Sequence, residues 1–273
     1  ILPSTSWGEH DGVYSSADRG FQRIRKAVEP LGDVKTDWEI ISAVATAMGY
    51  PMNYKNTEEI WDEMRSLCPK FAGASYKKIE EQGIVRWPCP TEDHKGTSYL
   101  YEGNKFTTPS GKGRLFACEW RPPVELTDEE YPLSLSTVRE VGHYSVRTMT
   151  GNCRALQKLA DEPGFIQMSI EDAEELNIKD QELVRITSRR GSVLSRALIT
   201  ERVKKGSTFM TYQWWIGACN ELTNDSLDPI SKTPEFKYCA IKVERIEDQK
   251  SAEEYIITEY ENIRKKMRIT SEK

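Results

Sequence analysis

A polar loop at residues 139–152 holds the side chains of this sequence that are best suited to bind a ligand. Arg139, His143 and Arg147 can donate hydrogen bonds to phosphate, and Glu140 offers an acceptor. Two glycines in the same loop let the backbone approach a ligand closely. The loop therefore predicts an anion-binding site, although a polar surface connection has a similar composition. For His143 we expect hydrogen bonding to a ligand rather than proton transfer.

A second set of candidates follows an apolar run that ends near residue 212. Tyr212 and Gln213 carry a hydroxyl and an amide beside the flat rings of Trp214 and Trp215. This combination suits a heterocycle, which is held by stacking on its faces and by hydrogen bonds at its edge. For the two tryptophans, packing in the core explains the sequence equally well.

Further polar candidates lie closer to the end of the chain. Asn220, Thr223 and Asp225 offer side chains that can read the edge of a base, and the same residue types routinely cap turns. Lys237 precedes the last long apolar run, where its ammonium group either neutralises phosphate or is solvated. Both interpretations stay open at this level.

The composition narrows the class of protein. The 273 residues are 38% hydrophobic and 30% charged, which is typical of a globular protein. A formal net charge of −5 without a basic block argues against nucleic acid as a partner. No apolar run approaches the roughly 18 residues of a membrane span. The six cysteines lack the spacing of zinc or iron-sulfur sites, so we expect reduced thiols, no metal site and a cytoplasmic location.

The first part of the chain predicts two amphipathic packing helices. A capping box at Thr36 and Glu39 opens the first, which Gly49 and Pro51 end. The second begins near Thr57. Its apolar residues recur at helical spacing, as do those of the first helix. From residue 71 to 132, prolines and glycines interrupt the pattern and indicate a domain boundary. Two short candidate strands fall inside this region, at residues 98–101 and 114–118.

The second part is mainly β. Strands are predicted at residues 133–138, 165–169, 183–188, 193–200, 208–212 and 240–246. A turn at residues 189–192 joins two of them, and Ser169 caps a helix inserted before the third. This order predicts a closed barrel with one inserted helix. The tail predicts a helix that docks on the barrel, through an apolar face of Tyr255, Ile256, Tyr260, Ile263 and Met267.

Three stretches, residues 135–152, 210–222 and 233–239, resemble the carboxy-terminal region of the molybdopterin-dependent formate dehydrogenases. Within the dimethyl sulfoxide reductase superfamily, the likeness is closest to the formate dehydrogenase H type. It extends over nearly the whole chain, and strings of this length are more specific than a short motif.

The resemblance implies a fold of the class α/β plus β. Residues 1–96 would be the C-terminal end of an α/β dinucleotide-binding-like domain, the molybdopterin oxidoreductase domain. Residues 97–273 would be a double-psi β-barrel that binds molybdopterin dinucleotide and ends in a C-terminal helix. The chain would then be a fragment of a longer subunit.

The resemblance also implies a cofactor and a reaction. The cofactor is bis-molybdopterin guanine dinucleotide with molybdenum or tungsten, and the reaction is the oxidation of formate to carbon dioxide. The implied cofactor contacts are Arg139, Glu140, Gly142, His143, Tyr144, Ser145, Tyr212, Gln213, Asn220, Thr223, Phe236, Lys237 and Tyr238.

The same resemblance places the rest of the catalytic machinery elsewhere. The selenocysteine or cysteine that ligates the metal and the cysteines of a 4Fe-4S cluster belong to family segments upstream of Ile1. We therefore expect no catalytic residue and no metal ligand in this chain, which would be inactive alone. The implied partners are the remainder of the subunit and electron-transfer or hydrogenase subunits. The alternatives are a fragment of another molybdopterin oxidoreductase, such as a nitrate reductase, and a non-catalytic cofactor- or protein-binding module.

Overall fold

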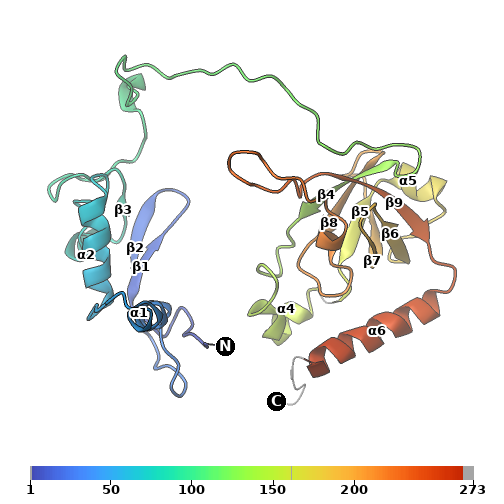
Figure 1. Cartoon of the computed structure of the whole chain (residues 1–273), viewed down its shortest axis with the longest axis horizontal. Helices are drawn as coiled ribbons and strands as arrows, with labels where there is room; N and C mark the ends of the chain where they lie inside the picture. The colour runs from blue at the N-terminus through green and yellow to red at the C-terminus, as the bar shows by residue number, and fades with distance from the viewer. Residues whose placement is uncertain (1, 161, 267–273) are drawn as a thin grey trace. The chain divides into compact units, whose positions relative to one another are not determined.

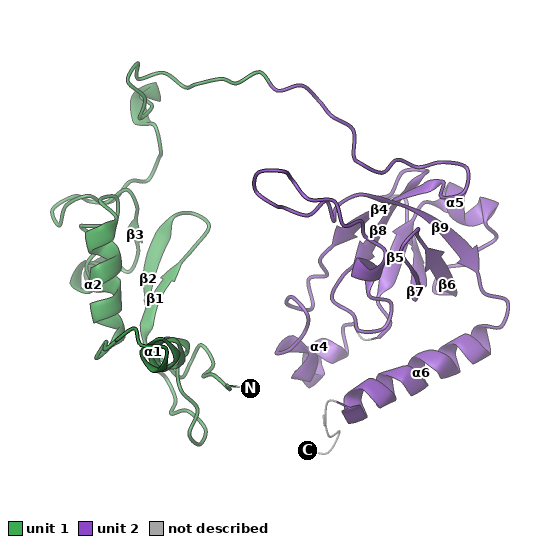
Figure 2. Cartoon of the chain, in the orientation of Figure 1, with its two compact units in different colours: residues 1–117 green, residues 118–273 purple. Residues whose placement is uncertain are grey.

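The protein consists of two compact units, residues 1–117 and residues 118–273 (Figure 2). The structure is a computed structural model that describes residues 2–160 and 162–266. The expected family domains, residues 1–96 and 97–273, stay a prediction, because compactness alone does not define a family domain.

The first unit is a small antiparallel sheet with three helices, of which the second and third contact the strands (Figure 1). Its core is aromatic: the ring of Phe21 meets those of Trp61 and Phe71 edge-on, with centroids 4.8 and 5.0 Å apart. Its elements are β1 (Gly12–Ser15), β2 (Gly20–Ile24), α1 (Asp37–Ala47), α2 (Thr57–Leu67), α3 (Tyr76–Gln82) and β3 (Val85–Arg86). The sequence did not predict the sheet, because β3 has only two residues and β1 buries none.

The predicted capping box of α1 is confirmed. The Thr36 hydroxyl accepts a hydrogen bond from the Glu39 N–H at 3.4 Å, and the Glu39 carboxylate accepts one from the Thr36 N–H at 2.9 Å. The expectation that α1 packs through its apolar side is wrong for this unit. Ile41, Val44 and Met48 are 59%, 45% and 82% exposed, since no described element of the unit covers them.

The predicted strands at residues 98–101 and 114–118 are wrong. After η1 (Glu102–Asn104), the described chain has no helix or strand until β4. Leu115 is 96% exposed, and the segment has no neighbouring strand with which to share hydrogen bonds. Short apolar runs between prolines and glycines therefore do not pair here.

The second unit is the predicted closed barrel (Figure 1). Its strands are β4 (Leu133–Val138), β5 (Phe165–Met168), β6 (Leu183–Thr187), β7 (Ser192–Ile199), β8 (Ser207–Thr211) and β9 (Cys239–Arg245). They close in the order β4-β8-β5-β7-β6-β9, with β4 parallel to β8 and β5 parallel to β7. Leu135, Ile166 and Met210 point inward and are fully buried. All six cysteines are free, and all lie in the described residues.

Five further helical segments and one tight turn lie in the described part of this unit. The helical segments are η2 (Thr150–Asn152), α4 (Arg154–Gln157), α5 (Ile170–Glu175), η3 (Cys219–Glu221) and α6 (Gln249–Lys266). Ser169 caps α5 as predicted, and the predicted turn joins β6 to β7 through a bond from the Ser188 N–H to the Gly191 carbonyl at 2.9 Å. Within the described ranges, no helix has the length and apolar character needed to cross a membrane.

The C-terminal helix α6 docks on the barrel as predicted, except that Tyr255 of the predicted face is 54% exposed. Ala252 and Ile256 are buried against Leu183 and Ile216, while Met267 lies outside the described residues. An apolar stripe on one side of the helix thus covers one end of β6.

Replacing Ile256 by alanine tests how much this docking stabilises the second unit. The side chain is 3% exposed, so the loss of its contacts should lower the free energy of unfolding by about 3 kcal/mol. Urea denaturation followed by tryptophan fluorescence measures the change. The matched control is Ile257→Ala on the same helix, where the side chain is 56% exposed. Equal losses in the two variants would contradict the docking described above.

Candidate functional site

A pocket of about 580 Å3 opens where β4 and β8 end. It is lined by Thr137, Arg139, Tyr212, Asn220, Thr223, Asn224, Pro234, Phe236 and Lys237. Six of these are predicted site residues, from three stretches that are far apart in the sequence. A slightly larger cavity of about 630 Å3, between α6 and the barrel, contains none of the predicted residues.

The parallel pairing of β4 and β8 creates this pocket. Val138 is paired with Thr211, so the next residues, Arg139 and Tyr212, leave the sheet side by side. The Arg139 Nε donates a hydrogen bond to the Tyr212 hydroxyl at 2.5 Å. A cation and an aromatic hydroxyl are thereby fixed at one edge of the opening.

The last part of the pocket wall is tied back to β4. The Thr137 hydroxyl donates to the Phe236 carbonyl at 3.0 Å, and the Lys237 Nζ donates to the Thr137 carbonyl at 2.6 Å. The same ammonium group lies 5.3 Å from the centroid of the Phe236 ring. Lys237, which precedes β9, thus brings a second positive charge to the pocket, in addition to that of Arg139 after β4.

Asn224 lines the pocket and was not predicted. Its Nδ2 donates to the carbonyl oxygens of Glu235 and Tyr238, at 3.2 and 3.0 Å. Its Oδ1 accepts a bond from the Ser226 N–H at 3.0 Å. The only signal in the sequence is the polar run around it, in which the predicted Asp225 is exposed and absent from the pocket lining.

The far end of this loop forms a turn of its own. Leu227 and Pro234 make an isolated β-bridge, and the Asp228 N–H donates to the Thr233 carbonyl at 2.9 Å. The turn separates a protruding tip from the residues that line the pocket.

Gln213 does not face the pocket but holds the loop of residues 139–152. Its amide is almost fully buried, at 1% exposure. The Oε1 accepts from the Glu140 N–H at 2.6 Å, and the Nε2 donates to the carbonyl oxygens of Glu140 and His143, at 3.1 and 2.6 Å. A buried amide with three hydrogen bonds fixes the start of the loop.

His143 is buried, and both of its ring nitrogens have partners within the chain. The Nε2 lies 2.8 Å from the Ala160 carbonyl, to which it donates, and the Nδ1 lies 3.1 Å from the Thr150 hydroxyl. The ring meets that of Trp214 edge-on. These contacts within the chain account for the buried position of His143. Its contact with a cofactor stays a prediction.

Arg147 does not offer a free donor for phosphate, contrary to the expectation from its type. Its guanidinium forms a buried ion pair with Glu162, in which the side chains are 3% and 2% exposed. Its Nε also donates to the Gln213 carbonyl at 2.9 Å. Glu162 accepts the N–H groups of Trp215 and Ile216, at 2.9 and 3.1 Å. The pair therefore joins the loop to the chain after β8.

The remaining predicted residues lie outside the pocket lining. Tyr144 is exposed, Ser145 has a positive φ of 47°, and a Cβ on Gly142 would lie 3.8 Å from the Leu159 Cβ. Tyr238 contributes a backbone carbonyl to the Asn224 bond. The assignment of these residues as cofactor contacts stays a prediction. Of the tryptophans left open, Trp214 is buried, at 3% exposure.

Comparison with known sequences identifies the family. The Molydopterin dinucleotide binding domain matches residues 133–240, and Molybdopterin oxidoreductase matches residues 1–47. Formate dehydrogenase H of Escherichia coli is 58% identical over 270 residues, which are 98% of this chain and 38% of that protein. The chain belongs to the molybdopterin oxidoreductases.

A second relative agrees with this family, and a solved structure shows the same fold. The F420-dependent formate dehydrogenase subunit alpha of Methanocaldococcus jannaschii is 42% identical, over 90% of this chain and 36% of the relative. Acetylene hydratase from Pelobacter acetylenicus shares the fold, with a TM-score of 0.68 and 17% identity over 90% of this chain and 38% of that one. The chain thus spans less than two fifths of the length of these proteins.

Replacing Gln213 tests whether its buried amide holds the loop of residues 139–152 in this molybdopterin oxidoreductase chain. Gln213→Leu replaces the amide with an apolar side chain and removes its three hydrogen bonds, leaving buried backbone groups unpaired. We expect a loss of about 2–3 kcal/mol in the free energy of unfolding. Amide exchange should also become faster around Glu140 and His143. The control is Gln22→Leu, on an exposed position of β2. Unchanged exchange in the loop would contradict the role of Gln213.

The buried carboxyl of Glu140 should make the stability of the protein depend on pH. Burial raises the pKa of its carboxyl above 4.5, and the nearby charges of His143 and Arg147 only partly offset this. Its Oε2 is buried without a hydrogen-bond partner among the described residues. An acid whose pKa is higher in the folded than in the unfolded state lowers the free energy of unfolding as pH rises between these two values. At still higher pH the destabilisation is complete. Glu140→Gln should therefore stabilise the protein at pH 7 more than at pH 4, as measured by urea denaturation. A larger gain at pH 4 would refute this.

Proposed function

We propose that this chain is the molybdopterin guanine dinucleotide-binding portion of a formate dehydrogenase that oxidises formate to carbon dioxide. The observation that carries the proposal is the pocket at the ends of β4 and β8, which combines the two cations Arg139 and Lys237 with the rings of Tyr212 and Phe236. This chemistry suits a nucleotide, whose diphosphate is negative and whose base is flat. The match to the dinucleotide binding domain covers the same strands.

Each part of the pocket has a role in this proposal. Arg139 and Lys237 contact phosphate, and the rings of Tyr212 and Phe236 pack against the flat parts of the ligand. Asn220 and Thr223 offer polar groups for the edge of the base, with Asn224 beside them. The loop that Gln213 holds completes the site through Glu140, Gly142, His143, Tyr144 and Ser145, and Tyr238 adds to it from beside Lys237.

The cofactor would supply the redox chemistry. When bound, it would carry the molybdenum or tungsten at which formate loses two electrons and a proton. This chain would bind and orient it, while the metal ligand and a 4Fe-4S cluster would come from a preceding part of the subunit. We propose the cytoplasm as the location of the complete enzyme, and electron-transfer or hydrogenase subunits as its partners. The family domains would be residues 1–96 and 97–273.

Replacing the two cations tests the proposal. Arg139→Met and Lys237→Met should each reduce the guanine nucleotide retained by the intact enzyme about tenfold, because each removes a charged phosphate contact. Nucleotide is released by acid and quantified by chromatography, beside the molybdenum and tungsten content. Lys179→Met, an exposed position outside the pocket, is the control.

The outcomes separate the candidate functions. Full nucleotide content in both variants would refute the assigned pocket. Loss of nucleotide together with loss of formate oxidation supports a formate dehydrogenase. Retained cofactor with turnover of nitrate and not of formate would indicate a nitrate reductase instead, and no nucleotide in the folded wild-type enzyme would indicate a non-catalytic module.

A further inference from the structure

The pocket wall formed by Thr223 and Asn224 is held through the backbone of the preceding residue. Thr223 and Asn224 directly follow Leu222, whose side chain is fully buried. The Leu222 carbonyl oxygen accepts two hydrogen bonds from Arg190, from the Nε at 3.1 Å and from the Nη2 at 2.7 Å. A planar guanidinium that grips one oxygen through two N–H groups fixes both its position and its direction.

Arg190 is itself held in place by the turn between β6 and β7. Its N–H donates to the Ser188 hydroxyl at 3.1 Å. The turn lies close to the wall, because a Cβ on Gly191 would come within 3.4 Å of the Glu221 carbonyl. The guanidinium therefore approaches Leu222 from a fixed starting point in the barrel.

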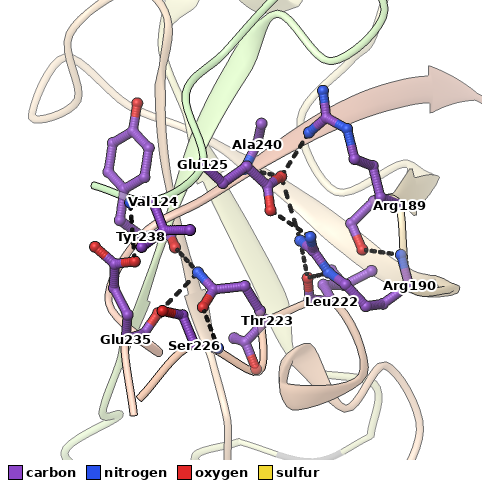
Figure 3. Close-up of polar contacts among 12 residues, drawn as sticks. Val124, Glu125, Arg189, Arg190, Leu222, Thr223, Ser226, Glu235, Tyr238 and Ala240 are labelled. Atoms are coloured by element: carbon purple, nitrogen blue, oxygen red, sulfur yellow. Dashed lines mark hydrogen bonds and ion pairs between the residues drawn. The ribbon is translucent and has the colours of Figure 1, made fainter. Parts of the chain in front are cut away.

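Glu125 holds the other side of the guanidinium. Its carboxylate, 11% exposed, accepts bonds from Arg190 and from the Ala240 N–H, the latter at 3.0 Å (Figure 3). Burial alone raises the pKa of Glu125, but the bonds from Arg190 and Ala240 and the charges of Arg189 and Arg190 outweigh it and lower the pKa. The carboxylate is charged at neutral pH and keeps Arg190 oriented.

The neighbouring Arg189 allows the positive charge of this turn to be compared with the hydrogen bonds to Leu222, which only Arg190 makes. It also pairs with Glu125, at 2.7 Å, and it carries the same charge in the same turn. Its other contacts are the Asp128 carboxylate and the ring of Tyr131, 4.6 Å from its Cζ. Both belong to the segment before β4 and not to the pocket wall. Arg190, unlike Arg189, contacts the wall (Figure 3).

We propose that Arg190 is a positioning residue that fixes the pocket wall at Thr223 and Asn224 through the Leu222 carbonyl, with Glu125 orienting its guanidinium. The value of this anchor for cofactor binding rests on the function proposed above. Arg190 touches no ligand in this proposal, so its effect is on the retention of the nucleotide and on the mobility of the wall.

The experiment compares Arg190→Met with Arg189→Met in the intact enzyme. Both changes remove one positive charge and one partner of Glu125, and only the first removes the bonds to Leu222. Two rates are measured: amide hydrogen exchange in the peptide of residues 219–226, and loss of guanine nucleotide during prolonged dialysis. We expect Arg190→Met to accelerate both roughly tenfold, and Arg189→Met to leave both within about twofold of wild type.

Each outcome decides the proposal. Equal rates in the two methionine variants would overturn it, because the shared loss of charge would then explain the effect. A wild-type enzyme without nucleotide would refute the proposed function, and the exchange rates alone would then decide whether Arg190 fixes the wall. If Arg190→Met does not fold, Arg190→Lys takes its place, since lysine keeps one donor. An intermediate exchange rate supports the proposal, and a wild-type rate overturns it.

Discussion

The parallel pairing of β4 with β8 is the constraint on which the rest of the second unit depends. Parallel strands place their carboxyl ends at the same edge of a sheet, and hairpin-linked strands cannot do this for neighbours. Because Val138 is paired with Thr211, two loops that start 73 residues apart emerge together. Closure of the barrel then fixes the orientation of both, since every strand has neighbours on two sides.

Polar groups buried around that edge turn two long loops into fixed surfaces. Gln213 bonds the backbone of one loop, and Arg190 bonds the backbone of the other. The ion pair of Arg147 with Glu162 adds a further attachment. Buried groups of this kind cost free energy when unpaired, so a loop that satisfies them has one strongly preferred conformation. Pre-organisation of a binding surface follows from packing beneath it and not only from the residues that face the ligand.

Local signals in the sequence predicted the barrel strands and the helices α1, α2, α5 and α6, but not the sheet of the first unit. The capping box at Thr36 and the N-cap at Ser169 each join residues three positions apart, and the six strands of the barrel were all predicted. Non-local contacts were out of reach. Nothing local shows that Gln213 would meet Glu140, or that Arg190, predicted only as part of a turn, would meet Leu222. The apolar side of α1 was misjudged because periodicity reports an apolar face and not what covers it.

The small turn closed by the Leu227–Pro234 bridge has an evolutionary consequence. Residues added or removed beyond that bridge change only the protruding tip, whereas one residue inserted in β4 would turn its alternating side chains to the opposite face. Changes in length should therefore accumulate at this tip during divergence, while the register of the strands is inherited intact. The Leu227–Pro234 bridge therefore marks the boundary between a tip whose length can change and strands whose register is fixed.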